Sequence, residues 1–334
     1  MSLYKPRVLF IGCGNIAGRF DMARPVDELP ITQAGAFQRH GGFELAACVD
    51  PDEQARLTFA AHWKIPYQAD SIQSLQVTCG EFDVIGLCSP TVLHHIHLEA
   101  ALALRPRVIF CEKPLTQSLS ESSRWEQECA LQGVSLVVNY TRQWDPSVAQ
   151  LIEEVQAGRW GSVRSVVGYY NKGIFNNGGH LIDLLLRLLG PLEVIAAGTP
   201  VHDYSNSDPT VSGLLQSVRE RIPICLAPAN AKDYALFELE LVCELGLVRM
   251  LNGGMQWETR IAEVSPHFSG YHTLVEAQIY EGHYKQAMTL AVTEIYDHLM
   301  CGAITRSTGG HALAIQAICE ELLAVATHTT PSIN

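Results

Sequence analysis

Short apolar runs and helical patterns alternate along the first 140 residues. Residues 8–11, 84–88 and 108–111 are apolar at nearly every position, and segments with helical periodicity separate them. Strands of this kind are buried on both faces, which is typical of a parallel sheet covered by helices on each side. The pattern therefore predicts an α/β domain, with a doubly wound Rossmann sheet, over residues 1–140.

The pattern changes after residue 140. Asp145-Pro146 starts an amphipathic helix that Gly158 ends, and two more helices are predicted near 285–300 and 310–327. Between them, one short helix near 180–189 interrupts a series of strand-like segments, at 163–170, 193–198, 211–218, 223–227, 234–242, 245–251 and 256–264. Successive strands without crossover helices pair antiparallel. We therefore expect an α+β domain with a large, mostly antiparallel open sheet over residues 141–334.

Composition indicates which partners are possible and in which cellular compartment the protein is expected. The formal net charge is −12 and Lys and Arg form no cluster, so a phosphate backbone would be repelled and nucleic acid is not expected as a partner. None of the ten cysteines forms a CxxC pair, which favours a reducing compartment. We expect no stretch to reach the roughly 18 apolar residues that span a membrane. These features predict a soluble cytoplasmic protein without a membrane partner.

The first strand ends in Gly12-Cys13-Gly14-Asn15-Ile16-Ala17, which matches G-x-G-x-x-A. In this motif Gly12 permits a tight turn, Gly14 lets the backbone approach a pyrophosphate, and Ala17 keeps helix and strand close. The helix that follows offers N–H groups and a positive dipole to phosphates. An ordinary glycine turn is the alternative, but the strand before the motif favours dinucleotide binding.

Asp50 ends the second predicted strand, where a carboxylate can accept hydrogen bonds from both ribose hydroxyls. Because it would repel a 2′-phosphate, Asp50 favours NAD over NADP. The distance from Gly14 exceeds the usual spacing of about 20 residues, and a loop insertion at 20–30 accounts for the excess. The alternative is that Asp50 only caps the helix that begins near Pro51.

Two further segments contain candidate chemistry. Glu112-Lys113-Pro114 follows a buried strand, at the end of the sheet where ligands bind in such folds, although a surface ion pair is the alternative. His94-His95-x-His97 has the residue type of a metal site, but adjacent histidines on a helix point in different directions and no acidic or cysteine partner is near. We predict no metal site.

The chain resembles the Gfo/Idh/MocA family of nicotinamide-dependent oxidoreductases over essentially its whole length. Five motifs occur in that family's order: Gly12–Ala17, Ser89-Pro90-Thr91-x-x-His94, Glu112-Lys113-Pro114, Asn139-Tyr140-x-Arg142-x-Trp144-Asp145-Pro146 and His180-x-x-Asp183. The segment Thr32–Phe37 resembles a branch associated with polysaccharide and modified-sugar biosynthesis. The resemblance implies NAD as the cofactor, with contacts from Gly12, Gly14, Asn15, Ile16, Asp50, Ser89, Pro90, Thr91, His94, Glu112 and Lys113.

The resemblance also assigns the chemistry. In the family, the lysine that matches Lys113 lies beside the nicotinamide and the reacting oxygen, often before a cis proline, and the histidine that matches His180 exchanges the proton. Many relatives have an aspartate four residues before that histidine, where this chain has Asn176, and an amide cannot relay a proton. His180 is therefore the expected acid and base. Substrate ligands are expected at Arg142, Tyr170, Lys172, Asn176 and Asp183, although Arg142 can instead pack structurally and Asp183 can instead orient His180 or bond to backbone.

The expected reaction is hydride transfer between NAD and a hydroxyl- or carbonyl-bearing carbon of a sugar or sugar nucleotide. Three alternatives stay open: an NAD-using lyase or glycosidase that oxidises its substrate transiently, a regulator that binds nicotinamide nucleotides without chemistry, and reduction of an imine or other non-sugar carbonyl. A broad open sheet would also expose an apolar face that association can cover. We therefore expect a homodimer or homotetramer formed through the C-terminal sheet.

Overall fold

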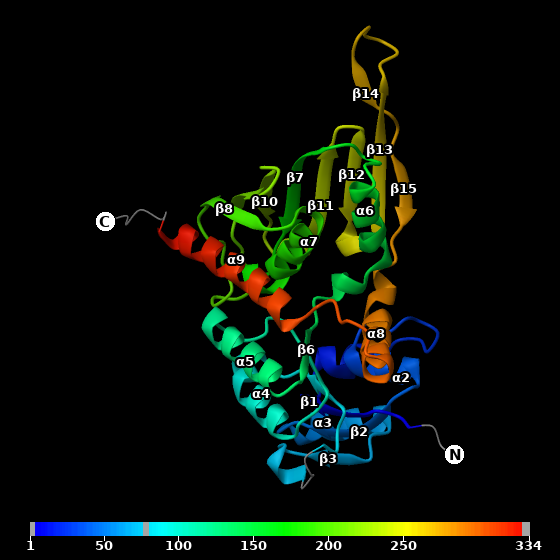
Figure 1. Ribbon diagram of the computed structural model, residues 1–334, viewed down its shortest axis with the longest axis vertical. Helices are drawn as coiled ribbons and strands as arrows, with labels where there is room; N and C mark the ends of the chain where they lie inside the picture. The colour runs from blue at the N-terminus through cyan, green and yellow to red at the C-terminus, as the bar shows by residue number, and fades with distance from the viewer. Residues whose placement is uncertain (1–3, 76–79, 329–334) are drawn as a thin grey trace. The chain divides into compact units, whose positions relative to one another are not determined.

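The computed structural model describes residues 4–75 and 80–328, and the chain divides into two compact units (Figure 1). The first unit comprises Met1–Trp144 and Lys285–Ala314, and the second comprises Asp145–Tyr284 and Ile315–Asn334. The chain therefore crosses from one unit to the other three times rather than once.

The first unit contains a six-stranded sheet in the order β3-β2-β1-β4-β5-β6, and every pair of neighbouring strands is parallel. Its strands are β1 (Arg7–Ile11), β2 (Glu44–Val49), β3 (Tyr67–Ala69), β4 (Val84–Leu87), β5 (Val108–Cys111) and β6 (Ser135–Val138). Its helices are α1 (Phe20–Met22), α2 (Gln33–His40), α3 (Glu53–Trp63), α4 (His94–Ala103), α5 (Leu119–Leu131) and α8 (Ala287–Cys301), with short helical turns at Asn15–Arg19, Gln73–Leu75, Thr91–Leu93 and Thr141–Trp144.

The core of the first unit forms where the apolar strands meet the helices. Phe10 of β1 is fully buried, and its ring packs edge-on against Phe37 of α2 at 5.9 Å and Phe59 of α3 at 5.5 Å between centroids. All four residues of β4 and of β5 are buried. The predicted doubly wound parallel sheet is confirmed, and the short edge strand β3 was not expected from the pattern.

Residues 285–314 pack on the first unit, whereas the sequence pattern led us to assign them to the second domain. The Tyr296 ring on α8 lies 4.7 Å from His40 and 5.4 Å from Phe43. Further along, the Val138 N–H donates to the Ser307 carbonyl at 2.8 Å, and the Ser307 hydroxyl donates back to the Val138 carbonyl at 2.6 Å. The returning segment thus satisfies the free edge of β6, which needs hydrogen-bond partners that local sequence does not reveal.

The second unit contains a nine-stranded sheet in the order β14-β13-β12-β11-β7-β10-β9-β8, with β15 also paired to β13. Only β7 and β10 pair parallel, so the predicted, mostly antiparallel open sheet is confirmed. The strands are β7 (Val163–Tyr170), β8 (Leu192–Ala197), β9 (Gly213–Ser217), β10 (Pro223–Pro228), β11 (Phe237–Cys243), β12 (Gly246–Leu251), β13 (Gln256–Val264), β14 (His272–Leu274) and β15 (Gln278–Glu281). The helices are α6 (Pro146–Gln156), α7 (Gly179–Leu189) and the C-terminal part of α9 (Gly309–His328), with short turns at Gly173–Gly178 and Asn252–Gly254.

One face of this sheet is packed against helices. Leu181 of α7 lies so close to Gly168 on β7 that a β-carbon there would overlap it, and Leu322 of α9 approaches Gly213 of β9 in the same way. Elsewhere in the sheet, three neighbouring strands place Glu240, Arg249 and Glu258 side by side in an ion-pair row. β14 and β15 extend the sheet beyond the strands that the sequence pattern predicted.

Helix α9 corrects our expectation about long apolar segments. Its 20 residues are long and apolar enough, by length and composition, to cross a membrane. In the structure, Ile315, Cys319, Leu322 and Ala326 are buried at spacings of four, three and four residues, which is the period of one helix face. This apolar character is used for packing, because the buried face belongs to the core of the second unit.

We expect Ser307→Ala to destabilise the first unit by about 1 kcal/mol, because the Val138 carbonyl loses a buried donor. Urea denaturation followed by near-ultraviolet circular dichroism measures the change. Ser120→Ala, on the exposed start of α5, is the matched control and should shift stability by less than about 0.5 kcal/mol. Equal effects of the two substitutions would contradict this account of the sheet edge.

Candidate active site

A cleft of about 710 Å³ opens where the carboxyl ends of β1, β2 and β4 meet in the first unit. The strand order reverses direction between β1 and β4, and this switch point is where ligands bind in open α/β sheets. The cleft is lined by backbone and side chains from four loops and from α4, namely Ile11, Gly12, Gly14, Asn15, Ile16, Phe20, Val49, Asp50, Pro51, Asp70, Ser71, Ile72, Gln73, Cys88, Ser89, Pro90, Leu93, Ile96, His97 and Ala100.

The glycine loop has the geometry that the motif predicts. Gly12 has φ +93°, and a β-carbon there would lie 2.8 Å from the Ser89 nitrogen, so glycine is required for both conformation and space. Above Gly14 nothing lies within 4 Å of where a β-carbon would be, so a ligand can approach the backbone. Ala17 is fully buried behind the turn. The loop thus leaves room for a phosphate group next to helical N–H groups.

Asp50 lines the cleft and also holds the glycine loop. Its Oδ2 accepts the Cys13 N–H at 2.8 Å, and its Oδ1 accepts the Asp52 N–H at 2.9 Å. The cap of α3 is Asp52, whose side chain accepts the Ala55 N–H at 3.0 Å. Asp50 is therefore not the helix cap, and its oxygens keep lone pairs on the side of the cleft.

The far wall of the cleft contains residues that motif reasoning missed. His97 lies one turn beyond His94, and its Nδ1 is 2.7 Å from the Ser89 hydroxyl. Burial lowers the pKa of His97, which favours the neutral ring. Ile96 and Leu93 expose apolar side chains on the same helical turn and line the cleft beside it. Leu93 directly precedes α4, and the three-residue spacing between Leu93 and Ile96 is the sequence signal that could have identified them.

His94 lies behind the cleft rather than in it. The ring is fully buried, with Nδ1 2.9 Å from the Leu115 carbonyl and Nε2 2.8 Å from the Ser89 carbonyl. It bridges the loop after β4 and the loop that contains Lys113-Pro114. The expectation of a cofactor contact from His94 is therefore corrected, because both ring nitrogens face backbone oxygens. Thr91, also expected at the cofactor, does not line the cleft.

Glu112 is likewise buried beneath the surface, 8% exposed, rather than in the cleft. Its Oε1 accepts from Gln33 Nε2 at 2.9 Å and from Asn139 Nδ2 at 2.7 Å. Burial raises the pKa of Glu112, against the opposing effect of these two hydrogen bonds and of the Lys113 charge. The Lys113-Pro114 bond that follows is cis, as predicted. Glu112 thus acts as an anchor for this loop.

In the second unit, Lys172 and Asn176 lie in the segment between β7 and α7, and His180 follows in the first turn of α7. Two aspartates that the sequence analysis did not single out shape that segment. Asp203 accepts the Lys172 N–H at 3.0 Å, and Asp208 accepts the Asn176 N–H at 3.0 Å. The backbone of 172–176 is therefore fixed by carboxylates from a loop that follows β8.

The remaining expected residues lie deeper. Tyr170 is fully buried and its hydroxyl both donates to the Val211 carbonyl and accepts the Val211 N–H, which argues against a substrate contact. Asp183 on α7 is fully buried, and Arg142 is 6% exposed in the first unit. His180 is 8% exposed, with its ring edge-on to Phe237 at 6.5 Å. Across residues 4–75 and 80–328, no group of three or more His, Cys, Asp or Glu side chains is arranged to hold a metal ion.

Part of the first unit matches a known protein family. Residues 6–140 match the family model GFO_IDH_MocA, described as an oxidoreductase family with an NAD-binding Rossmann fold. The rhizopine catabolism protein MocA of Rhizobium meliloti is 29% identical over 122 residues, which cover 36% of this chain and 37% of that protein. The matched segments span 37% of the length of MocA and 24% of the length of a second curated relative, an oxidoreductase of Bacillus subtilis.

Solved structures share the fold over nearly the whole chain. The 3-ketoreductase KijD10 from Actinomadura kijaniata, in complex with NADP, has a TM-score of 0.76 at 18% identity and covers 97% of this chain and 98% of its own. The WlbA dehydrogenase from Bordetella pertussis, in complex with NADH and UDP-GlcNAcA, has a TM-score of 0.75 at 19% identity, with 98% of each chain covered. At these identities the likeness concerns the fold.

The burial of Glu112 predicts a pH dependence of stability. Its folded-state pKa is raised above the unfolded value, so its contribution is fully present below about pH 4.3 and is lost as the pH rises through the folded pKa. Glu112→Gln keeps an acceptor oxygen and removes the charge. We expect the melting temperature of this variant, relative to the native chain, to be higher at about pH 8 than at about pH 4.

Differential scanning fluorimetry at both pH values measures this difference. Glu99→Gln, on the exposed side of α4, is the control for removal of a charge. A difference that is the same at both pH values would contradict the proposed burial effect.

Proposed function

We propose that the chain transfers a hydride between NAD and a hydroxyl- or carbonyl-bearing carbon of a sugar or sugar nucleotide, because residues 6–140 match the model of the Gfo/Idh/MocA family of NAD-binding oxidoreductases. The observation that supports this most directly is the cleft at the β1/β4 switch point, where Gly14 leaves the backbone open and Asp50 faces the same space. The proposed enzyme is an NAD-dependent dehydrogenase or reductase that acts on CH–OH groups.

The described residues fit a dinucleotide. Gly12, Gly14, Asn15 and Ile16 form the turn that would receive the pyrophosphate, with the helical N–H groups directed at its charge. The Asp50 carboxylate would accept hydrogen bonds from the ribose hydroxyls. Apolar side chains on the far wall, from Ile72, Leu93 and Ile96, would pack on the adenine ring. When bound, NAD supplies the hydride acceptor or donor.

Lys113 and His180 are the proposed catalytic residues. Lys113 follows β5, at the same sheet edge as the cleft, and its ammonium group would hold the substrate oxygen and stabilise negative charge that develops there. In the oxidation direction His180 would take the proton of a substrate hydroxyl, and in the reverse direction it would return a proton. Lys172 and Asn176, on the same segment as His180, are the proposed ligands for other substrate hydroxyls.

The proposed substrate class rests on two solved structures of similar fold and on the loop before α7. KijD10 and WlbA were crystallised with TDP-benzene and with UDP-GlcNAcA, respectively, so sugar nucleotides are the first substrates to test. A polar segment with Lys172 and Asn176 suits a ligand that is rich in hydroxyl groups, because each hydroxyl offers both a donor and an acceptor.

We further propose that the enzyme is cytoplasmic and forms a homodimer or homotetramer through the sheet of the second unit. That sheet exposes large apolar side chains, including Ile195, Leu214 and Ile261, each more than 40% exposed. Apolar exposure of this kind is reduced when a second copy covers it. Sedimentation velocity measures the oligomeric state.

Cofactor preference tests the role of Asp50. We expect NADH to bind the native chain several-fold more tightly than NADPH, because the carboxylate opposes the 2′-phosphate. Asp50→Asn should shift the ratio of the two dissociation constants toward NADPH by about tenfold, which corresponds to ~1.4 kcal/mol. Fluorescence titration of both reduced cofactors measures the ratio. Asp52→Asn, which alters the cap of α3 but not the cleft lining, should leave the ratio unchanged, and equal affinities in the native chain would contradict the assignment.

Turnover tests Lys113 and His180. Against a panel of UDP- and TDP-sugars, His180→Ala should lower kcat by about 10²- to 10⁴-fold while the dissociation constant of NADH changes little. Lys113→Ala should lower kcat and also weaken NADH binding, because in the proposed site the amine would touch the cofactor as well as the substrate. Reduced-cofactor absorbance and product formation are followed together, since product without a change in absorbance would indicate transient oxidation instead. His202→Ala, exposed in the second unit, is the control, and normal turnover by His180→Ala would end the assignment.

A further inference from the structure

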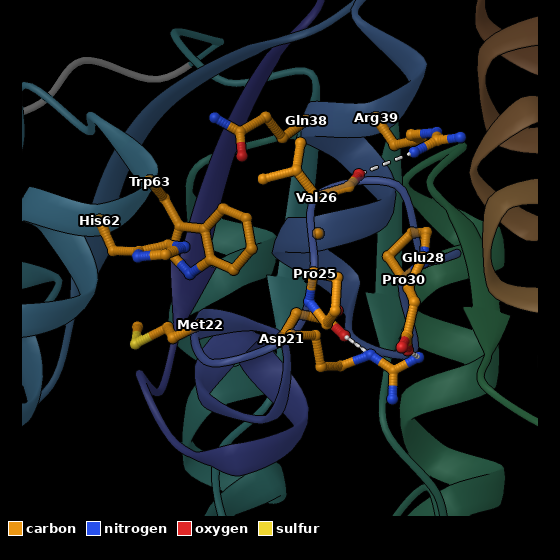
Figure 2. Close-up of a pocket in the computed structure, with 12 residues that line it drawn as sticks. Asp21, Met22, Pro25, Val26, Glu28, Pro30, Gln38, Arg39, His62 and Trp63 are labelled. Atoms are coloured by element: carbon orange, nitrogen blue, oxygen red, sulfur yellow. Dashed lines mark hydrogen bonds and ion pairs between the residues drawn. The ribbon is translucent and has the colours of Figure 1, made fainter.

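The first unit contains a second pocket, and it shares no lining residue with the nucleotide cleft. Its volume is about 420 Å³, within the range of small-molecule sites. It is lined by residues of the 20–30 insertion, of α2 and of the end of α3 (Figure 2). The proposed function leaves this pocket, and the insertion that builds it, without a role.

The insertion holds its shape through a buried carboxylate. The Asp21 side chain, 7% exposed, accepts the Thr32 N–H at 2.9 Å and the Thr32 hydroxyl at 2.5 Å, so it joins the two ends of the loop. It also pairs with Arg24 at 3.3 Å, and Arg24 pairs with Glu28 at 2.6 Å. These interactions lie within the loop itself, so the wall of the pocket is organised before any ligand binds.

The pocket has an apolar side formed by Trp63. This indole is 5% exposed, and its Nε1 has no hydrogen-bond partner among the described residues. Nε1 lies next to Gly18, where a β-carbon would overlap it, so the ring can occupy this position only because residue 18 has no side chain. Figure 2 places the indole across the hollow from Pro25 and Val26. Val26 is 95% exposed although hydrogen bonds and ion pairs hold the loop in place, so its apolar surface is left for a ligand.

Arg39 contributes a positive charge to the lining of the pocket. Its Nη1 donates to the Val26 carbonyl at 3.1 Å, and no described carboxylate lies within 4.0 Å of its guanidinium. Arg24, by contrast, is neutralised by its two acidic partners. A guanidinium paired only with a carbonyl, on a chain of net charge −12, retains donors that fit a carboxylate.

We propose that this pocket binds a small organic acid with an aromatic or branched apolar body. The body would pack between Trp63 and the Pro25-Val26 wall, and the carboxylate would accept hydrogen bonds from Arg39. This site is separate from the nucleotide cleft and does not depend on the redox chemistry proposed above.

Phenylacetate is the probe, and 2-phenylethanol is its uncharged match. The protein is labelled with 5-fluorotryptophan, which gives one fluorine signal for each of the five tryptophans. Trp63→Phe assigns the Trp63 signal, and if that variant does not fold, single substitutions of the other four assign it by elimination. We expect phenylacetate to shift the Trp63 signal saturably and the other four signals little, with 2-phenylethanol binding roughly threefold to tenfold more weakly.

Two comparisons locate the bound acid. Arg39→Gln should reduce the affinity for phenylacetate to that for 2-phenylethanol. Arg105 is an exposed arginine of the same unit outside the pocket, and Arg105→Gln should leave both affinities unchanged. The shift caused by phenylacetate should persist when NADH is saturating. The proposal is overturned if the Trp63 signal does not respond, if the acid and the alcohol bind equally, or if NADH displaces the acid.

Discussion

The nucleotide cleft depends on the close approach of two backbone segments at Gly12. A β-carbon at this position would lie 2.8 Å from the Ser89 nitrogen and 2.9 Å from the Cys88 carbonyl carbon, and the residue has φ +93°. The end of β1 and the loop after β4 can therefore touch only if residue 12 is glycine. This contact sets the floor of the cleft, and the open backbone at Gly14 lies directly beyond it.

Polar side chains, half-buried at Asp50 and buried at His94 and Glu112, then fix the loops around that floor. Asp50 accepts the Cys13 N–H, His94 lies between the Ser89 and Leu115 carbonyls, and Glu112 accepts from Gln33 and Asn139. A buried polar group is costly unless it is hydrogen-bonded, so each of these residues strongly favours one loop geometry. The loop that contains Lys113 is held in this way by residues that do not line the cleft.

Carboxylates play the same organising role in the two other loops of interest. Asp21 closes the 20–30 insertion around a separate pocket, and Asp203 and Asp208 order the backbone of the segment before α7. In each case one side chain accepts backbone N–H groups that the loop cannot satisfy internally. A loop ordered by its own hydrogen bonds can present side chains to a ligand without first losing conformational entropy.

The sequence alone determined the features that are local in the chain. Continuous apolar runs predicted the parallel sheet. Successive strand-like segments without crossover helices predicted the second sheet. The spacing of Gly12, Gly14 and Ala17 predicted the nucleotide-binding turn. Asp145 was readable as the start of a helix because its capping bond, from the Ser147 N–H, spans only two residues. Each of these depends on backbone periodicity or on neighbours in sequence.

Only the tertiary structure decided which polar residues face the cleft and which lie behind it. Tyr170, His94 and Glu112 were expected to contact ligands, yet their partners are buried groups contributed by other segments, such as Val211 for Tyr170 and Gln33 for Glu112. The return of 285–314 to the first unit depends in the same way on the open edge of β6. A hydrogen-bond partner distant in sequence leaves no periodic trace, so these assignments required the fold.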